Sequence, residues 1–129
     1  MQLFEDRSMS KVNVMVEYTD PKYLSDPINY KLHMKSDIYS LSVLLWELSS
    51  GFPPYSKFKQ SNDQLRYDIL NGLREEFVEN TPIKYQRLYQ RCWKEDPDQR
   101  PNIFEVFEIL NQLKLDIGIF TWIFNFHAS

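Results

Sequence analysis

Residues 35–51 read Lys-Ser-Asp-Ile-Tyr-Ser-Leu-Ser-Val-Leu-Leu-Trp-Glu-Leu-Ser-Ser-Gly, and this stretch decides how the rest of the chain is interpreted. The spacing i, i+3, i+4 and i+7 of an amphipathic helix is met by Leu41, Leu44, Leu45 and Leu48. Val43 and Trp46 widen the apolar surface around the same helix. The pattern predicts a helix that lies in a core, with its leucines turned inward.

Both ends of this helix carry boundary signals. Ser36 is a candidate N-cap, and Asp37 falls in the first turn, where the helix dipole favours an anion. Gly51 can take the left-handed conformation that closes a helix. A buried helix of any all-α domain would explain the leucines, but it gives no reason for Asp37.

Three further landmarks surround the helix in a fixed order. They are Tyr18-Thr-Asp-Pro-Lys22 upstream, Gly51-Phe-Pro-Pro-Tyr55 directly after it, and Cys92-Trp-Lys-Glu-Asp-Pro-Asp-Gln-Arg-Pro101 downstream. Together the four segments resemble the eukaryotic protein-kinase family, in the part from the end of the activation segment to the last helix. The resemblance implies a mainly α fold, namely an incomplete helical C-lobe portion of the protein-kinase fold.

The resemblance also assigns structural motif positions, and one of them is occupied by an unexpected charge. These positions are Tyr18, Asp20, Pro21, Lys22, Asp37, Tyr39, Trp46, Trp93 and Arg100. The family's Ala-Pro-Glu triplet, whose Glu pairs with the Arg at the position of Arg100, here reads Asp20-Pro21-Lys22. An unpaired buried charge is costly, so either Asp20, Asp96 or Asp98 must turn toward Arg100, or Lys22 must point into solvent.

Other positions depart from the family pattern more mildly. Val14 and Met15 stand where the family often has Gly-Thr, so a hydroxyl contact to the catalytic loop is not expected. Ser42 replaces a glycine, and its hydroxyl can bond back to a carbonyl one turn earlier. The family's counterpart of Asp37 accepts hydrogen bonds from the catalytic loop. Because that loop is not in this sequence, we expect Asp37 to serve its own helix N-terminus.

The motifs that carry kinase chemistry do not occur in these 129 residues. Phosphoryl transfer as the family performs it needs a Gly-rich loop, a Lys paired with a helix Glu, a catalytic Asp and an Asp that holds Mg²⁺. Gly51, Gly72 and Gly118 are far apart, and neither His33 nor His127 is followed by Arg-Asp. ATP and Mg²⁺ are therefore implied for a complete domain only. We assign no catalytic, cofactor-binding or metal-binding residue here and predict an inert chain.

Composition places the chain among small folded domains. Its 43% hydrophobic and 16% aromatic content can supply one core, and its net charge of −3 gives no signature of nucleic-acid binding. A single cysteine, Cys92, and a start without a basic and apolar leader favour a reducing, cytoplasmic setting.

The remaining segments divide the chain into three parts. Residues 1–17 are expected to be an extended, activation-segment-like stretch, residues 18–114 a partial kinase domain, and residues 115–129 an apolar tail. Possible substrate-facing or partner-facing residues are Met15, Glu75, Glu76 and Glu79, although an acidic run is more often simply a solvated face. Three further helices are predicted: one capped by Asn62 that runs to Asn71, one from Pro82 to Cys92 and one after Pro101. The second is expected to turn Tyr85, Leu88, Tyr89 and Cys92 inward. The third is expected to have Ile103, Val106, Phe107, Leu110 and Leu113 on its core face.

The tail contains only about half of the ~20 apolar residues that a membrane span needs. It could cover a bare face of the fold, associate with another chain or have no selected role. Three functions remain open for the whole chain: part of an active protein kinase, a non-catalytic interaction module, or a truncated product without function.

Overall fold

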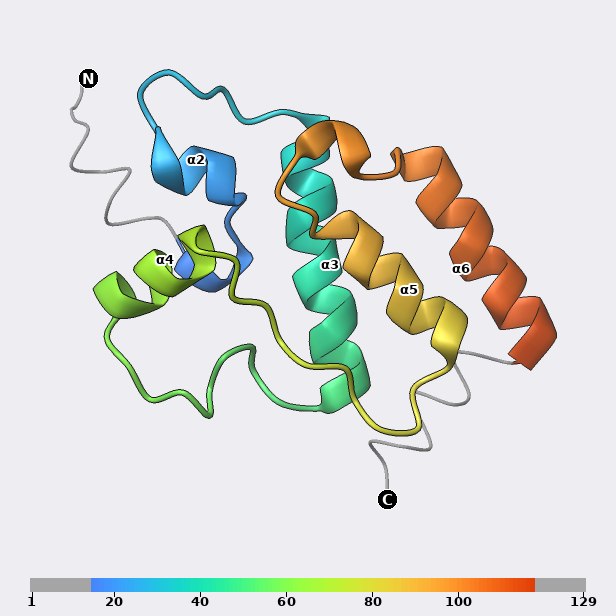
Figure 1. Ribbon diagram of the computed structural model, residues 1–129. Helices are drawn as coiled ribbons and strands as arrows, with labels where there is room; N and C mark the ends of the chain where they lie inside the picture. Colours follow the sequence, from blue (N-terminus) through green and yellow to red (C-terminus); the bar gives the residue numbers. More distant parts are fainter. Residues whose placement is uncertain (1–14, 118–129) are drawn as a thin grey trace.

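The computed structural model describes residues 15–117, with side chains described through residue 114, and these residues form a helical fold (Figure 1). The elements in chain order are η1 (Val16–Tyr18), α2 (Pro21–Ser25), α3 (Met34–Ser50), α4 (Asn62–Leu70), α5 (Ile83–Cys92), η2 (Pro97–Gln99) and α6 (Ile103–Ile117). No strand occurs among the described residues. The prediction of a mainly α fold is confirmed.

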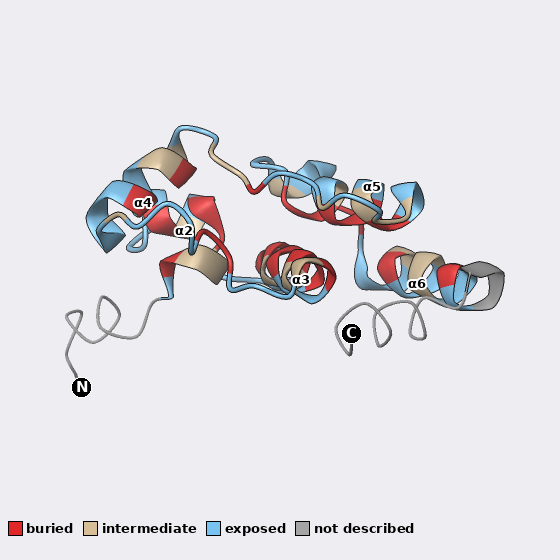
Figure 2. Ribbon diagram, turned by 90° about the horizontal axis from the view of Figure 1, so that it is seen from below, coloured by how far each residue is buried: buried red, intermediate tan, exposed pale blue. Residues whose placement is uncertain are grey.

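Helix α3 runs through the middle of the arrangement, with α2 and α4 on one side of it and α6 on the other (Figure 1). Helix α5 packs across α3 and also contacts α6. Viewed from below, α5 lies in a different layer from α3 and α6, and the buried residues of α3 and α5 face each other (Figure 2). The main core is therefore a contact between two layers of helices.

The N-cap of helix α3 lies three residues before the predicted one, Ser36. The N-cap is His33, whose Nδ1 accepts from the Lys35 amide at 3.1 Å, while the Ser36 hydroxyl accepts from the His33 amide at 3.1 Å. Ser36 is thus the third residue of a capping arrangement and not the N-cap. The prediction for the other end is confirmed, because Gly51 adopts a left-handed φ of 79°.

The face that α3 buries differs from the predicted leucine face. Its buried residues are Ser36, Ile38, Tyr39, Ser42, Val43, Leu45, Trp46 and Ser49. Leu44 and Leu48 are instead 47% and 49% exposed, so the prediction that they point inward is wrong. The aromatic and β-branched side chains of α3 take the contact with α5, which turns these two leucines to the opposite side of the helix.

Helix α5 follows its sequence pattern closely. Tyr85, Leu88, Tyr89 and Cys92 are all buried, as predicted. Together with α3 they form the main core, which also includes Trp93 and the α6 residues Val106 and Leu113. Of the other residues predicted for the core face of α6, Leu110 is half-buried, whereas Ile103 and Phe107 are 42% and 67% exposed.

A smaller core lies on the other side of α3. It is formed by Val16, Leu24, Tyr55, Leu65 and Ile69, from η1, α2, α4 and the connection between α3 and α4. Helix α4 is capped by Ser61, whose hydroxyl accepts from the Gln64 amide at 3.2 Å, one residue before the predicted cap Asn62.

The ends of the chain fall partly outside the described residues. The predicted extended stretch 1–17 is described only from Met15, and its last residues form the 3₁₀ helix η1 instead of an extended segment. Helix α6 continues to Ile117, so residues 115–117 of the expected tail are helical, and residues 118–129 lie outside the described part. Within residues 15–117 no helix is long and apolar enough to span a bilayer.

Candidate functional site

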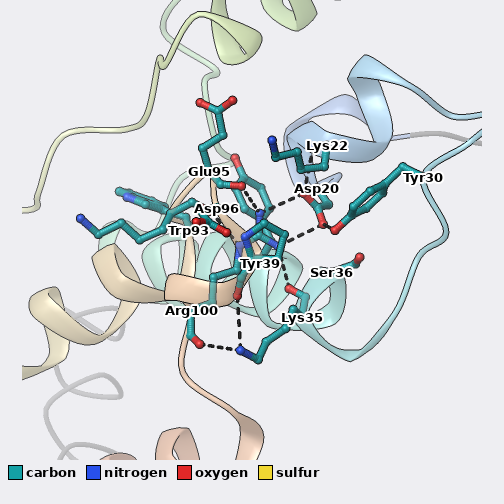
Figure 3. A network of polar contacts seen from close by, with 12 residues as sticks. Asp20, Lys22, Tyr30, Lys35, Ser36, Tyr39, Trp93, Glu95, Asp96 and Arg100 are labelled. Atoms are coloured by element: carbon teal, nitrogen blue, oxygen red, sulfur yellow. Dashed lines mark hydrogen bonds and ion pairs between the residues drawn. The ribbon is translucent and has the colours of Figure 1, made fainter.

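Asp20 and Arg100 form a buried, two-pronged ion pair between segments 80 residues apart (Figure 3). Arg100 Nη1 donates to Asp20 Oδ2 at 3.0 Å, and Arg100 Nη2 donates to Asp20 Oδ1 at 2.9 Å. Both side chains are fully buried. The pair fixes the segment before α2 against the turn that precedes α6.

The other N–H groups of Arg100 are also bonded. Nε donates to the Lys94 carbonyl at 2.7 Å, Nη1 to the Lys35 carbonyl at 2.8 Å and Nη2 to the Glu95 carbonyl at 3.0 Å. Lys35 in turn donates from Nζ to the Arg100 carbonyl at 2.8 Å. A guanidinium has five N–H donors, and here each has an acceptor, so the buried cation is fully satisfied.

Asp20 has two further donors besides Arg100. The Lys22 amide donates to Oδ1 at 3.0 Å, which makes Asp20 the N-cap of α2, and the Tyr30 hydroxyl donates to Oδ2 at 2.9 Å. Burial alone raises the pKa of Asp20, but the hydrogen bonds from Arg100, Lys22 and Tyr30 and the charge of Arg100 outweigh it. The pKa of Asp20 therefore lies below its usual value, and the carboxylate stays ionised.

The Asp20–Arg100 pair explains how the charge of Arg100 is neutralised although Lys22 stands in the place of the family's glutamate. Asp20 supplies the carboxylate from two positions earlier, while Lys22 is exposed. Asp96, another candidate, is exposed and accepts instead from the Asp98 amide at 3.0 Å as the cap of η2. Asp20 is thus the compensating acid, and Pro21 is buried behind it as the first residue of α2.

Tyr39 lies between two arginines. The Cζ atoms of Arg74 and Arg100 are 5.3 and 5.2 Å from the centre of its ring, within the range of cation–π attraction. The ring is completely buried, and burial raises the pKa of Tyr39 to about 12. Tyr39 therefore stays neutral, and its ring packs against the guanidinium of the Asp20–Arg100 pair.

Tyr18 ties the same segment to the middle of α3. Its hydroxyl donates to Glu47 Oε1 at 2.5 Å, and its carbonyl accepts from the Ser40 hydroxyl at 2.7 Å. Burial, followed by the hydrogen bond to Glu47, raises the pKa of Tyr18 to about 12. Tyr18 therefore packs against the central helix α3 and the main core.

The remaining motif residues, on α3 and after α5, contact only other parts of the fold. Trp46 is buried and donates from Nε1 to the Glu76 carbonyl at 2.7 Å. Ser42 is buried, and its hydroxyl donates to the Tyr39 carbonyl at 2.5 Å, the back-bond expected for this serine. Trp93 is buried at the end of α5, where its carbonyl accepts from Arg74 Nε at 3.1 Å.

Asp37 is exposed in the first turn of α3. Its role at the N-terminus of its own helix stays a prediction. In the family this carboxylate receives a loop that the present sequence does not contain.

The acidic residues predicted to face a partner separate into two groups. Glu76 and Glu79 are exposed, as is Met15 at 62%. Glu75 is 7% exposed, and its Oε2 accepts from the Tyr55 amide at 2.6 Å, so the expectation of a surface acid is wrong for Glu75. Tyr55 has a left-handed φ of 60°, and the buried carboxylate holds this unfavourable backbone in place.

Sequence reasoning did not single out Tyr30, Lys35, Glu47 or Arg74. Each contacts a motif residue from a position without a local pattern: Tyr30 lies in a loop, Lys35 and Glu47 look like ordinary surface charges of a helix, and Arg74 lies in an irregular connection. No spacing rule could have found them, because their partners are brought close only by the packing of separate helices.

Among the side chains described, those of residues 15–114, no three His, Cys, Asp or Glu residues gather in one place. Several of the buried polar side chains described above meet in the Asp20–Arg100 network. Every N–H group of Arg100 in this network already has an acceptor, and the network links separate segments of the fold.

Comparison with known proteins places this architecture in a family. The profile of the family described as protein tyrosine and serine/threonine kinase matches residues 4–110. The chain is 36% identical over 84 residues to the serine/threonine-protein kinase STY17 of Arabidopsis thaliana, which is 65% of this chain and 15% of that protein. It is 39% identical over 99 residues to the tyrosine-protein kinase transforming protein Fps of avian sarcoma virus (strain PRCII), which is 75% of this chain and 17% of that protein.

Another relative, the cyclic GMP-binding protein C of Dictyostelium discoideum, is 37% identical over 81 residues, which is 61% of this chain and 3% of that protein. The chain thus spans less than a fifth of the length of these curated relatives. Since the family profile covers most of the sequence and the helices match the expected C-lobe portion, the chain belongs to the protein tyrosine and serine/threonine kinase family.

Proposed function

We propose that this chain is the helical scaffold part of a protein kinase domain and transfers no phosphate by itself. The observation that carries the proposal is the buried Asp20–Arg100 pair. It links the segment that resembles the end of the activation segment to the turn before the last helix, and it uses a different acid from the family's usual one. A substituted pair that is still fully bonded indicates that this anchor has a role in the fold of the chain.

In a complete kinase domain this scaffold would support the loop that carries the catalytic acid. Asp37 is exposed at the start of α3, where the family's carboxylate receives that loop. Phosphorylation of protein hydroxyl groups in signal transduction, with ATP and Mg²⁺, would then depend on residues outside this sequence. The proposal includes a cytoplasmic setting, supported by the single cysteine, Cys92, which is buried.

The proposed inertness can be tested on the purified chain. We expect no heat of binding when Mg²⁺-ATP is titrated into it, and no phosphate transfer to generic Ser, Thr or Tyr peptides. Phosphorylation above a no-protein control, lost on addition of a metal chelator, would overturn this part of the proposal.

The scaffold role can be tested by a chimera. Residues 15–117 replace the matching segment in the kinase domain of STY17, and autophosphorylation of the chimera is compared with that of a version that also carries Asp37→Asn. We expect the first chimera to be active and the second to lose most of its activity while unfolding at the same temperature. A stably folded but inactive first chimera would contradict the scaffold role.

A second candidate function is a non-catalytic interaction module, favoured by exposed aromatic residues around α4. Phe52, Tyr67 and Phe77 are 66%, 63% and 60% exposed. Protein interaction sites are enriched in such side chains. If the first chimera is folded but inactive, and the triple variant F52S/Y67S/F77S loses a protein partner that the wild-type chain binds directly, the module function is preferred.

A further inference from the structure

His33 lies between the loop after α2 and the first turn of α3, and both nitrogens of its ring make contacts. Nδ1 accepts a hydrogen bond from the Lys35 amide at 3.1 Å, which makes His33 the N-cap of α3. Nε2 lies 3.2 Å from the oxygen of the Tyr30 hydroxyl. The rings of His33 and Tyr30 also pack together, with their centroids 5.5 Å apart, so the imidazole is held from two sides.

These contacts assign the proton of the neutral imidazole. Because a backbone amide can only donate, Nδ1 must be without a proton, and the neutral ring then carries its proton on Nε2. The Tyr30 hydroxyl donates to Asp20 Oδ2 at 2.9 Å (Figure 3), so its oxygen is left to accept from Nε2–H. The hydrogen bonds thus run in one direction, from His33 through Tyr30 to the Asp20 carboxylate.

The other two members of this hydrogen-bonded chain keep their protonation states around neutral pH. Burial raises the pKa of Tyr30, so its hydroxyl retains the proton that it donates. The Asp20 carboxylate, ionised beside Arg100, remains the final acceptor. Histidine is the side chain that ordinarily changes its charge between pH 5 and pH 8. His33 is therefore the member that responds to pH in this range.

We propose that protonation of His33 uncaps α3 and loosens the first turn of this helix. A protonated imidazole carries hydrogens on both nitrogens and has no lone pair left to accept from the Lys35 amide. The positive charge also lies at the positive end of the helix dipole, where a cation is disfavoured. The residues that commonly cap helices are Ser, Thr, Asp and Asn, which accept hydrogen bonds throughout this pH range. A histidine cap works only while its ring is neutral.

The charged groups on the segments that meet around His33 carry both signs. They are Asp20, Lys31, Lys35, Asp37, Asp98 of η2 and Arg100. Asp20 and Asp37 offset the charge of a cation on the ring, so the ring can take up a proton while the fold persists. The Lys35 ammonium is held elsewhere, since its Nζ donates to the Pro97 and Arg100 carbonyls at 3.3 and 2.8 Å. Loss of the hydrogen bond from the Lys35 amide is therefore the main local effect of protonation.

Uncapping has a consequence for the proposed scaffold. The first turn of α3 carries Asp37, the acid to which the proposed function gives the catalytic loop. Loosening of this turn would then make the docking of that loop depend on pH. This consequence rests on the proposed function, whereas the uncapping itself concerns the present chain and is tested without kinase activity.

The protonation state of His33 can be measured by ¹⁵N NMR on the full chain between pH 8 and pH 5. His33→Asn is the matched control, because asparagine is a good N-cap whose charge does not change with pH. The sequence has one other histidine, His127, so the His33 ring signals are assigned as those missing in this variant. At pH 8 we expect Nδ1 of His33 to show the shift of an unprotonated nitrogen and Nε2 that of a protonated one. The opposite tautomer would overturn the proposal, because Nδ1 could not then cap α3.

The state of the cap is read from hydrogen exchange of the Lys35 amide, expressed relative to an unstructured chain at the same pH. We expect its protection to fall roughly fivefold from pH 8 to pH 5 in the wild type, the factor that corresponds to a typical N-cap, and to stay constant in His33→Asn. His33→Ala, which has no cap at any pH, should already show the low protection at pH 8. Constant protection of Lys35 in the wild type would overturn the proposal.

An internal control separates uncapping of α3 from a general loosening of the fold at low pH. The Gln64 amide donates to the Ser61 hydroxyl at 3.2 Å and holds the corresponding place at the start of α4. Because serine does not titrate in this range, we expect the protection of Gln64 to be the same at pH 8 and pH 5. An equal loss of protection at Gln64 and Lys35 would overturn the assignment of the effect to His33.

Discussion

The Asp20 carboxylate meets the Arg100 guanidinium through two hydrogen bonds, of 2.9 and 3.0 Å, inside a fully buried pair. The acid comes from two residues before the position at which the family carries its glutamate. The exchange keeps the charge balance of the site because Asp20, at the N-cap of α2, is buried against Arg100, while Lys22 is exposed. The charge of Arg100 is thus neutralised as in the family, but by a different residue, Asp20.

Removing either partner of this pair should destabilise the fold strongly. We expect Asp20→Ala to lower the free energy of unfolding by about 3–5 kcal/mol, since it leaves Arg100 buried without its counter-charge. The matched control is Arg91→Ala, which breaks the half-exposed pair with Glu105 (2.8 Å) and should cost less than about 1 kcal/mol. Urea unfolding curves measure both, and equal losses would contradict the role given to Asp20.

Replacing the exposed Lys22 by glutamate tests whether position 22 can take part in neutralising Arg100. Lys22→Glu restores the family's residue, but Lys22 is exposed and Arg100 already has five acceptors. We therefore expect a change in unfolding free energy within about 0.5 kcal/mol. The double variant Asp20→Ala/Lys22→Glu is informative, because a recovery of stability in it would show that a glutamate at position 22 can reach Arg100.

The same pair predicts a dependence of stability on pH. The pKa of Asp20 is lower in the folded chain than the usual value of about 3.9. Its contribution is therefore fully present above that usual value and is lost as pH falls through the depressed folded value. Unfolding free energies of the wild type and of Asp20→Asn, measured from pH 7 to pH 2, should converge at the acid end. A constant difference over this range would contradict the prediction.

Glu75 should be important for stability even though it lies in an acidic run. Glu75→Gln keeps the shape but removes the charge that accepts from the Tyr55 amide, so we expect a loss of about 1–3 kcal/mol. Glu79→Gln, on the exposed part of the same run, serves as the control and should change little. Thermal unfolding followed by circular dichroism separates the two, and identical melting curves would mean that the Tyr55 amide does not need this partner.

Loss of the hydroxyl group should change the stability of the fold differently at two tyrosines on the main core. The buried Tyr39 hydroxyl makes no hydrogen bond of ordinary geometry and has only a weaker interaction with the Tyr55 hydroxyl, so Tyr39→Phe should leave stability nearly unchanged or raise it. Tyr18→Phe removes the donor to Glu47 and should cost about 0.5–1.5 kcal/mol. Denaturant midpoints of the two variants provide the comparison, and a larger loss for Tyr39→Phe would contradict it.

Cys92 should be chemically silent in the folded chain. Burial raises the pKa of its thiol to about 12, and the thiolate is the reactive form. We expect iodoacetamide at pH 8 to modify the native chain much more slowly than the chain in urea, as followed by mass spectrometry. Rapid native labelling would show that the end of α5 opens.

Much of this protein was predictable from its sequence. The order of the four motifs indicated the family, and periodicity found the long helix α3, apart from its first residues, and the inward face of α5. These features are local, since a helix and its caps depend on residues a few positions apart. The back-bond of Ser42 and the left-handed Gly51 follow from the same short-range rules.

Only the tertiary structure decided which side of α3 is buried, which acid neutralises Arg100 and why Glu75 is inside. Helical periodicity identifies apolar positions but does not say which neighbour they meet, and α5 selected Tyr39, Val43 and Trp46 over Leu44 and Leu48. The partner of Arg100 lies 80 residues away, and several acids were equally available along the chain. The physical reason is that burial and ion pairing depend on distances in space, which the packing of separate helices sets.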